Sequence, residues 1–407
     1  MKDVGVWKKE LRERVLQRID YGKELTDTEV EDLIDEVMLK EEAIRLCSLR
    51  VRQRLKKELF DSLRRLDILQ IFVEDPSITE IMINGKDHIF IERDGRIEEL
   101  DLRFESKEKL QDVIQQIVAG CNRVVNEASP IVDARLANGA RVNIVMAPVA
   151  LNGPVVTIRR FPEKPITMEE LLRRESISEE AAVFLQQLVL AGYNIFISGS
   201  TGSGKTTLLN VLSGFIPQKQ RIITIEDNAE LQLQGIRNLV RLETRNSNVE
   251  GCHEITIRDL IRTSLRMRPD RLIVGEVRGA EAVDMIQALN TGHDGSMSTG
   301  HANSAADMLS RLENMILMGI DIPLSAVRRQ LASGIDIIVH LGRLRDGSRK
   351  VLEIVEVTGF KEGEIELHTL FQFEESDGDT QGGVMGILRK EGSLIHGKKL
   401  EMARLRI

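Results

Sequence analysis

The 407-residue chain contains few aromatic residues, few cysteines and no long apolar run. Aromatic residues make up 3% of it, so the stacking surfaces that bind single-stranded nucleic acids are scarce. Cys47, Cys121 and Cys252 lie far apart in the chain, which predicts free thiols in a reducing compartment rather than a disulfide framework or a zinc site. Two uncharged stretches, 142–158 and 181–204, are broken by glycines, amide side chains or prolines, so we expect neither to span a bilayer.

The charge balance restricts the class of partner. The net charge is −8 and the pI is about 5.6, which argues against binding to the phosphate backbone of nucleic acids. The first residues, MKDVGVWKKELRER, lack the apolar core of a signal peptide. We therefore expect a cytoplasmic protein without a nucleic-acid partner.

The sequence divides into four parts by its periodicity. Charged helical patterns fill the start, short alternating strands follow, a linker with a short charged helix comes next, and strands then alternate with helices. The predicted parts are a helical segment (1–67), a small α+β domain (68–165), a linker (166–179) and an α/β domain with a C-terminal hairpin and tail (180–407).

The helical segment separates its charges along the chain. Thr26 and Glu29 have the spacing of a capping box at a helix start. Acidic residues dominate 24–42, and a basic block follows it. This pattern indicates either a solvated helical hairpin with opposed charges or a docking surface for a partner protein or an anionic lipid. The basic block consists of Arg45, Arg50, Arg52, Arg54, Lys56 and Lys57.

The last part has the alternation of an α/β sheet, in which ligands bind at the carboxyl ends of the strands. A hairpin is expected at 351–360 and 364–373. The other predicted strands of this part are 194–198, 221–225, 238–243, 271–275, 296–299 and 335–340, and its helices are 180–191, 206–214, 256–265, 280–290, 304–318 and 323–333. In the small domain, strands are predicted at 78–84, 88–92, 131–136, 141–146 and 155–160, with a helix at 110–121.

A phosphate-binding loop follows the first apolar strand of the α/β part. Residues 199–206, GSTGSGKT, match G-x-x-x-x-G-K-[ST] and lead into a helix. The glycines allow backbone N–H groups to point at phosphate oxygens. Lys205 is expected to reach the β- and γ-phosphates, and Thr206 to offer its hydroxyl to Mg²⁺. The predicted nucleotide contacts are Gly199, Ser200, Thr201, Gly202, Ser203, Gly204, Lys205, Thr206 and Thr207.

Carboxylates follow two other strands of the predicted sheet. Glu226 and Asp227 end the strand 221–225, where they can hold Mg²⁺-bound or attacking water, although Asp227 can also cap a helix. Glu276 ends the strand 271–275 as in a Walker B motif, but Gly275 stands where the Mg²⁺ aspartate is usual. Glu276 is the candidate for orienting or deprotonating the lytic water, and Thr206, Glu226, Asp227 and Glu276 are the predicted metal-site residues.

Two histidines flank a short strand rich in small residues. His293 and His301 lie in TGHDGSMSTGHAN, and a histidine at a strand end can hydrogen-bond a γ-phosphate. A metal pair is the alternative, but no third ligand is evident. We therefore expect both histidines near the nucleotide.

Together these motifs resemble the secretion ATPase superfamily, which drives type II and type IV secretion and pilus assembly. GSTGSGKTTLLN, TIEDNAELQL, LRMRPDRLIVGEVRGAEAVDM and NTGHDGSMSTGHANS are similar to its Walker A, Asp box, Walker B and His box. NEASPIVDARLANGARVN, VVTIRRF and VRLETRNSN most resemble its Tad/Flp pilus branch of CpaF type. The resemblance covers about residues 68–345.

The resemblance implies a RecA-like P-loop domain that hydrolyses ATP with Mg²⁺ in a ring-shaped homo-hexamer. It also implies peripheral association with the inner face of the cytoplasmic membrane and with pilus or secretion platform proteins there. Members supply arginines from the small domain to the phosphates, and a planar guanidinium suits this role. The matching residues are Arg135, Arg141, Arg159 and Arg160, while Arg266 and Arg268 are candidates for reaching a neighbouring subunit's site.

Two other classes of P-loop protein fit the core motifs. A nucleic-acid translocase would show stimulation of its ATPase activity by DNA, and neither the acidic balance nor the scarce aromatics favour it. A small-molecule kinase would need an acceptor pocket, whereas the arginine-bearing domain ahead of the loop favours assembly. A motor for pilin or substrate export is the leading hypothesis.

Overall fold

The computed structural model describes residues 4–19, 22–23, 25–93, 95–121, 123–160, 165–245, 253–376 and 384–406. The chain forms two compact units, unit 1 (Met1–Glu163) and unit 2 (Lys164–Ile407). Cys47 and Cys121 are free thiols, as predicted, and Cys252 lies outside the described residues. Among the described residues, no helix has the length and apolarity needed to cross a membrane.

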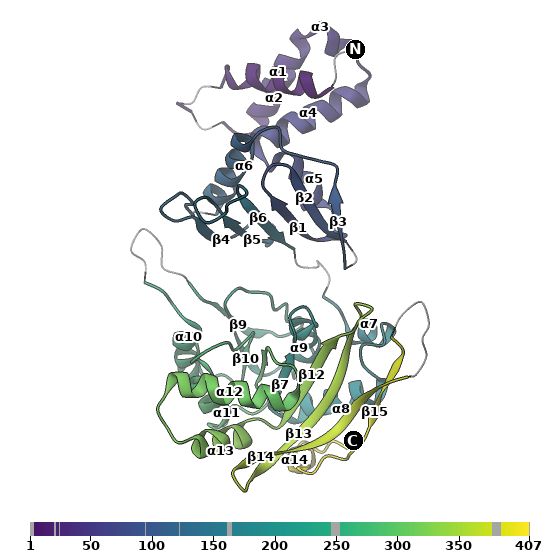
Figure 1. Cartoon of the computed structure of the whole chain (residues 1–407), viewed down its shortest axis with the longest axis vertical. Helices are drawn as coiled ribbons and strands as arrows, with labels where there is room; N and C mark the ends of the chain where they lie inside the picture. The colour runs from purple at the N-terminus through teal and green to yellow at the C-terminus, as the bar shows by residue number, and fades with distance from the viewer. Residues whose placement is uncertain are drawn as a thin grey trace. The chain divides into compact units, whose positions relative to one another are not determined.

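The start of unit 1 is a helical bundle with its own apolar core. Leu11, Ile34 and Leu59 are buried in it together with other aliphatic side chains. The predicted capping box begins the second helix, where the Glu29 N–H donates to Thr26 Oγ1 at 3.3 Å and the Thr26 N–H donates to Glu29 Oε2 at 2.7 Å. The helices are α1 (Val4–Leu16), α2 (Asp27–Lys40), α3 (Glu42–Arg45) and α4 (Leu49–Arg64) (Figure 1).

The rest of unit 1 is an antiparallel sheet packed on one long helix. The strand order is β3-β2-β1-β6-β5-β4. Alternate residues such as Ile81, Ile83 and Ile144 point to the core, where Leu110 and Ile114 of the helix meet them. The elements are η1 (Asp67–Leu69), α5 (Gln70–Glu74), β1 (Ile78–Asn84), β2 (His88–Arg93), β3 (Arg96–Leu100), α6 (Lys107–Gly120), β4 (Ile131–Arg135), β5 (Arg141–Val145) and β6 (Val155–Arg159).

Unit 2 is built on a nine-stranded sheet with a parallel centre. The order is β15-β14-β13-β12-β7-β11-β10-β8-β9, and the strands from β12 to β9 run parallel. The strands are β7 (Ile195–Gly199), β8 (Arg221–Glu226), β9 (Asn238–Glu243), β10 (Arg271–Val274), β11 (Met297–Gly300), β12 (Ile337–Arg343), β13 (Arg349–Lys361), β14 (Glu364–Glu375) and β15 (Gly386–Lys390).

Helices cover both faces of this sheet. Phe196 of β7 packs in a core with α10 to α13, whereas Ile195 and Ile197 pack in a second core with α8, α9 and α14. Strands buried on both faces are apolar at nearly every position, which made the central strands recognisable. The helices are α7 (Met168–Arg173), α8 (Glu179–Ala191), α9 (Lys205–Ser213), α10 (Ile257–Ser264), η2 (Leu265–Met267), α11 (Ala282–Leu289), α12 (Ala305–Gly319), α13 (Leu324–Gly334) and α14 (Lys398–Ala403).

The observed elements confirm the predicted fold class of an α/β domain preceded by α+β and helical parts. Six elements were not predicted: the strands β3 and β15, the helices α5 and α14, and the single turns η1 and η2. The strand β3 is exposed along most of its length, so it has no apolar alternation to recognise.

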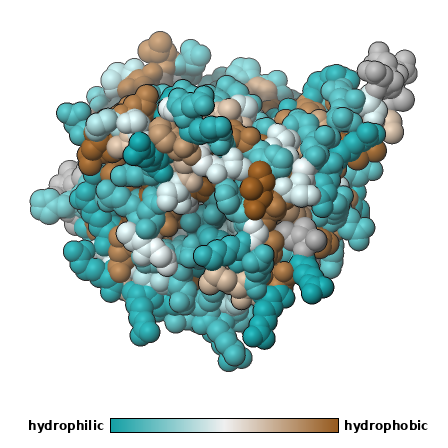
Figure 2. Space-filling model, turned by 90° about the horizontal axis from the view of Figure 1, so that it is seen from below, coloured by the Kyte–Doolittle hydropathy of each residue, from teal (hydrophilic) through white to brown (hydrophobic). Residues whose placement is uncertain are grey.

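The face of the molecule drawn in Figure 2 is mainly hydrophilic, with apolar residues in small separate groups.

The segment after β15 is fixed to the sheet by a buried carboxylate. Glu356 of β13 is 1% exposed, and its oxygens accept hydrogen bonds from the N–H groups of Ile395 and His396, both at 2.7 Å. Nearby, Tyr193 Oη donates to the carbonyl of His396 at 2.7 Å. Lys399 Nζ donates to Asp336 Oδ2 at 2.7 Å. These contacts give the C-terminal segment a structural role.

We expect Glu356→Ala to lower the free energy of unfolding of unit 2 by about 2–4 kcal/mol, because two charge-assisted hydrogen bonds are lost. Amide hydrogen exchange at Ile395 and His396 should become faster, while exchange in β7 should not. The control is Glu366→Ala, which removes an exposed carboxylate from the neighbouring strand β14. Unchanged protection of Ile395 and His396 would contradict this role for Glu356.

Candidate functional site

The phosphate loop joins β7 to α9, and two of its turns require glycine. Gly199 has a φ of 156°, and a Cβ there would lie 2.4 Å from the Leu341 carbonyl oxygen and 2.6 Å from Ser203 Oγ. Gly204 has a φ of 98° and is the N-cap of α9, whose first turn no side chain caps. The N–H groups of that turn can therefore bind an anion.

Lys205 lies inside this loop with its ammonium group shielded from solvent. Its Nζ donates to the carbonyl oxygens of Gly199 at 3.1 Å and Ser200 at 2.9 Å. Burial lowers the pKa of Lys205, and the carboxylate of Glu276 opposes that shift. A phosphate group at the uncapped helix end would also stabilise the ammonium. The loop residues therefore fit a triphosphate.

Glu226 is almost completely buried at the end of β8, and its two carboxylate oxygens differ in their hydrogen bonding. Oε1 accepts hydrogen bonds from the N–H groups of Glu230 at 2.8 Å and Leu231 at 2.9 Å. Oε2 is shielded from solvent and has no hydrogen-bond partner among the described residues. Burial raises the pKa of Glu226. Glu226 thus orders the loop after β8 and keeps one oxygen for a further donor or metal-bound water.

The position of the Glu226 side chain requires a glycine at residue 275. A Cβ on Gly275 would lie 2.9 Å from Glu226 Cγ, which is tighter than non-bonded carbon atoms allow. The structure therefore explains the departure from the usual Walker B pattern. The side chain of Glu226 occupies the space beside the strand end that an aspartate at 275 would need.

Glu276 is the second carboxylate, and it connects to the loop through a histidine. Its Oε1 lies 2.9 Å from His301 Nε2, and its Oε2 accepts a hydrogen bond from Arg278 Nη2 at 2.7 Å. His301 Nδ1 lies 3.2 Å from Lys205 Nζ. Since an ammonium group only donates, Nδ1 is the acceptor, and the ring proton belongs on Nε2. Glu276 Oε1 is close to Nε2 but has no hydrogen bond of proper geometry among the described residues. Lys205, His301 and Glu276 form one connected cluster.

The residues at the loop fit a metal that is held mainly by the nucleotide and water. Among the described residues, no three His, Cys, Asp or Glu side chains gather into a metal site. Mg²⁺ bound with substrate phosphates needs only one or two protein ligands. Thr206, at the second position of α9, has the place in the motif for direct contact. Asp227 is half-exposed, and its Oδ2 lies 3.9 Å from Arg278 Nη1.

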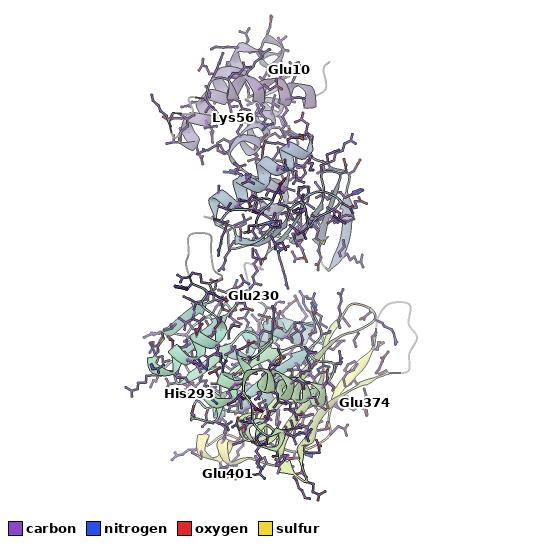
Figure 3. All side chains as sticks on the ribbon, turned by 60° about the vertical axis from the view of Figure 1, so that its left-hand side comes forward. Glu10, Lys56, Glu230, His293, Glu374 and Glu401 are labelled. Carbon is purple, nitrogen blue, oxygen red and sulfur yellow. The ribbon has the colours of Figure 1, made fainter. Side chains whose placement is uncertain are left out.

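The structure does not bring His293, Arg266 and Arg268 to this cluster. His293 precedes β11, so it lies at the amino-terminal edge of the sheet, whereas the loop lies at the carboxyl edge. Its Nδ1 is 3.1 Å from the Ala288 carbonyl oxygen. Figure 3 shows His293 well away from Glu230, which follows the carboxyl end of β8. Arg266 and Arg268 are exposed ahead of β10, at the same amino-terminal edge.

Unit 1 carries a row of arginines across three neighbouring strands. Arg135 of β4 is paired with Arg141 of β5, which is paired with Arg159 of β6. Directly opposite residues share one face of a sheet, and like charges there are unfavourable. Glu80 of β1 continues the row opposite Arg159, and burial raises the pKa of Glu80. Such a row suits an anionic ligand.

Arg160 is separate from that row. It directly follows Arg159, and successive residues of a strand point to opposite faces. Its guanidinium donates to the carbonyl oxygen of Asp75, and its backbone N–H donates to the Thr79 carbonyl at 2.8 Å. These contacts hold the start of β1, so Arg160 has a structural use within unit 1.

Two neighbours of the cluster were not predicted from the sequence. Arg278 holds Glu276, and the signal for it is the basic residue two positions after that carboxylate. His340 of β12 is buried opposite Ser198 of β7, with its Nδ1 2.9 Å from Ser198 Oγ. Burial lowers the pKa of His340. A histidine within the apolar run of a central strand is the only sequence sign of that contact.

Comparisons with known proteins agree with this geometry. Residues 63–375 match the family described as type II/IV secretion system protein. A putative conjugal transfer protein of Mycobacterium tuberculosis is 32% identical over 332 residues, which are 80% of this chain and 94% of that protein. The conjugal transfer protein TrbB of Rhizobium radiobacter is 30% identical over 333 residues, 81% of this chain and 98% of that protein.

Solved structures show the same fold. The pilus retraction motor PilT with bound ADP superposes with a TM-score of 0.52 at 20% identity, over 84% of this chain and 87% of that one. The ATPase DotB of Legionella pneumophila superposes with a TM-score of 0.50 at 21% identity, over 72% of this chain and 80% of that one. The RecA-like fold predicted for the α/β domain is thereby confirmed.

We expect ATP turnover to fall in acid as His301 protonates. Burial lowers the pKa of His301 below its ordinary value, so the ring is neutral at neutral pH and gains its proton only in more acidic solution. The resulting imidazolium would lie beside the Lys205 ammonium and lose Nδ1 as an acceptor. Turnover measured against pH should show an acid limb with an apparent pKa below about 6.5.

The matched variants are His301→Asn, whose amide can replace Nδ1, and His301→Gln, whose amide can replace Nε2. Neither side chain titrates, so both should lose this acid limb. His301→Asn should keep the contact with Lys205 in the nucleotide-free state, whereas His301→Gln should lose it. An unchanged acid limb in both variants would assign the titration to another group.

Proposed function

The chain belongs to the type II/IV secretion system protein family and is a P-loop ATPase, and we propose that it is the motor of a pilus or protein-export machine. The observation that carries this proposal is the cluster of Lys205, His301 and Glu276 at an uncapped helix N-terminus. It joins the group that grips a terminal phosphate to the group that can activate water. Through this link, hydrolysis can change the contacts of Lys205 and of Glu276 together.

Within the family, we place the chain in the Tad/Flp pilus branch. Three runs support this placement: residues 126–143 and 155–161, which carry the arginines of unit 1, and residues 240–248, which begin within β9. The similarity to conjugal transfer proteins supports the broader class of type IV secretion motors. Pilin assembly and substrate export both require the same conversion of ATP hydrolysis into movement.

Each residue of the cluster has a distinct task in hydrolysis. Lys205 and the first-turn N–H groups of α9 bind the β- and γ-phosphates and stabilise the charge that develops on them. Glu276 orients the attacking water and accepts its proton, and Arg278 fixes the direction of that carboxylate. Thr206 would hold Mg²⁺, which neutralises phosphate charge when bound, with Glu226 and Asp227 acting through water.

His301 reports on the phosphate. When Lys205 binds the γ-phosphate, its hydrogen bonds to the loop carbonyls and to His301 Nδ1 are exchanged for the stronger charge-assisted contact. The ring is then free to turn, and the Nε2 contact with Glu276 changes with it. Loss of the phosphate after hydrolysis reverses these changes. His301 is thus the proposed sensor of the nucleotide state.

The arginine row Arg135, Arg141 and Arg159 supplies positive charge from unit 1. We propose that these residues contact the phosphates of bound nucleotide, so that binding and release of ATP move unit 1 relative to unit 2. Arg266 and Arg268 lie at the sheet edge opposite their own loop, which favours contact with a neighbouring subunit. Both features favour a closed ring, and we propose a homo-hexamer.

We further propose that this ring works in the cytoplasm at the inner face of the cytoplasmic membrane. Its partners there would be the platform proteins of the pilus or secretion apparatus. The acidic charge of the chain and its scarce aromatics favour a protein partner over a nucleic acid.

We expect Glu276→Gln to bind ATP but to hydrolyse it at least about a hundredfold more slowly, because the general base is lost. With ATP present, light scattering should show this variant as a hexamer. Lys205→Ala is the matched control, since it should lose nucleotide affinity and the ring should not form in response to ATP. Near-normal turnover by Glu276→Gln, or a strict monomer with ATP, would contradict the proposal, as would stimulation of turnover by DNA.

Removing an arginine of the row should lower turnover without affecting the fold. We expect Arg141→Ala and Arg159→Ala to lower kcat at least about tenfold, since arginines that stabilise phosphoryl transfer contribute 10³-fold or more. Arg96→Ala is the control, because Arg96 is exposed on β3 of the same sheet, outside the row. If kcat were equal in all three variants, the arginine row of unit 1 would have no part in the reaction.

A further inference from the structure

Three leucines are exposed around one end of the helical bundle in unit 1. Leu39 near the end of α2 is 59% exposed, Leu46 after α3 is 83% exposed, and Leu49 at the start of α4 is 63% exposed. Within unit 1, Figure 1 places α3 at the end of the bundle away from the strands. A single exposed leucine needs no explanation, but three beside one short turn form an apolar surface that the bundle core does not use.

Unpaired arginines lie on the same turn. Residues 43–57 include six basic residues and no acidic one. Arg54, Lys56 and Lys57 have carboxylate partners. Arg45 and Arg50 are exposed and form no ion pair within the described part of the chain. Arg50 also lies in the first turn of α4, where no acid balances the positive end of the helix dipole.

We propose that this surface, the bundle tip of Leu39, Arg45, Leu46, Leu49 and Arg50, binds the headgroup region of an anionic membrane. Leucine side chains can enter the boundary between headgroups and acyl chains, while guanidinium groups bind lipid phosphates. An anionic surface would also relieve the unfavourable position of Arg50 at the helix N-terminus. The inference deepens the membrane association proposed above by assigning it to named residues.

The charges favour lipid over a second copy of the chain. The acidic helix α2 could attract a basic tip, but four of its six carboxylates already have basic partners within the bundle: Asp27 pairs with Arg64, Glu31 and Asp35 with Lys56, and Glu36 with Lys40. Figure 3 shows Lys56 among the helices of this bundle. The whole chain carries a net charge of −8, so an anionic membrane would repel the chain as a whole and attract its basic block. The basic tip would therefore approach first.

The test is flotation of the full chain with vesicles. We expect it to float with phosphatidylcholine vesicles that contain phosphatidylglycerol and not with phosphatidylcholine alone, and the binding should weaken as salt is added. Arg45→Gln and Arg50→Gln should each weaken binding about fivefold, the usual effect of one basic residue near such a surface. Leu46→Asp/Leu49→Asp should abolish flotation, because charge opposes insertion of the tip.

Two control variants test whether the effect on vesicle binding is specific to the bundle tip. Leu151→Asp changes a leucine of unit 1 that is 92% exposed outside the bundle, and Arg96→Gln removes an exposed arginine of β3. Both should float like the unaltered chain. ATP turnover without vesicles should be the same in every variant. If turnover is absent in the unaltered chain while flotation behaves as expected, the motor proposal fails and the tip assignment stands.

Three results would overturn the inference. The first is equal flotation with both kinds of vesicle, and the second is flotation of the leucine variant like the unaltered chain. The third is a change in molecular mass by light scattering in the tip variants with vesicle binding unchanged, which would make the tip an interface between copies. Circular dichroism would confirm that these variants remain folded, as expected for exposed positions.

Discussion

A buried ammonium group is the interaction on which the functional half of the molecule depends. Lys205 Nζ is held by the carbonyl oxygens of its own loop and lies beside His301. Burial weakens its charged form, so the site is poised for an anion that would offset this cost. The sheet, the glycine turns and α9 all serve to place that one positive charge next to Glu276.

Most of unit 2 could be predicted from its sequence because its parallel strands are buried on both faces. Such strands are short apolar runs between helices, and the phosphate loop fixes which of them is first. The strands that were missed are edge strands. β3 is charged and exposed, and β15 is a five-residue strand that opens on Gly386. Edge strands are identified by their partner strand rather than by a pattern of their own.

The site residues also divide into those whose position could be predicted from the sequence and those whose position could not. The loop, Glu226, Glu276 and His301 follow the carboxyl ends of strands, and position along a strand is readable from sequence. His293 was misplaced because β11 lies between it and His301, so the two histidines belong to opposite edges of the sheet. Arg160 lies apart from the arginine row because adjacent residues of a strand face opposite ways. Both cases concern direction in space, which proximity along the chain does not encode.

The contact between Glu226 and Gly275 joins two motifs that sequence alone treats as independent. They draw on a single volume at the margin of β8 and β10, so enlarging one residue requires shortening the other. Substitutions at the two positions are therefore expected to be coupled, because an aspartate at 275 needs a shorter residue at 226. The glycine in the place of the usual Walker B aspartate thus follows from the long acid on the neighbouring strand.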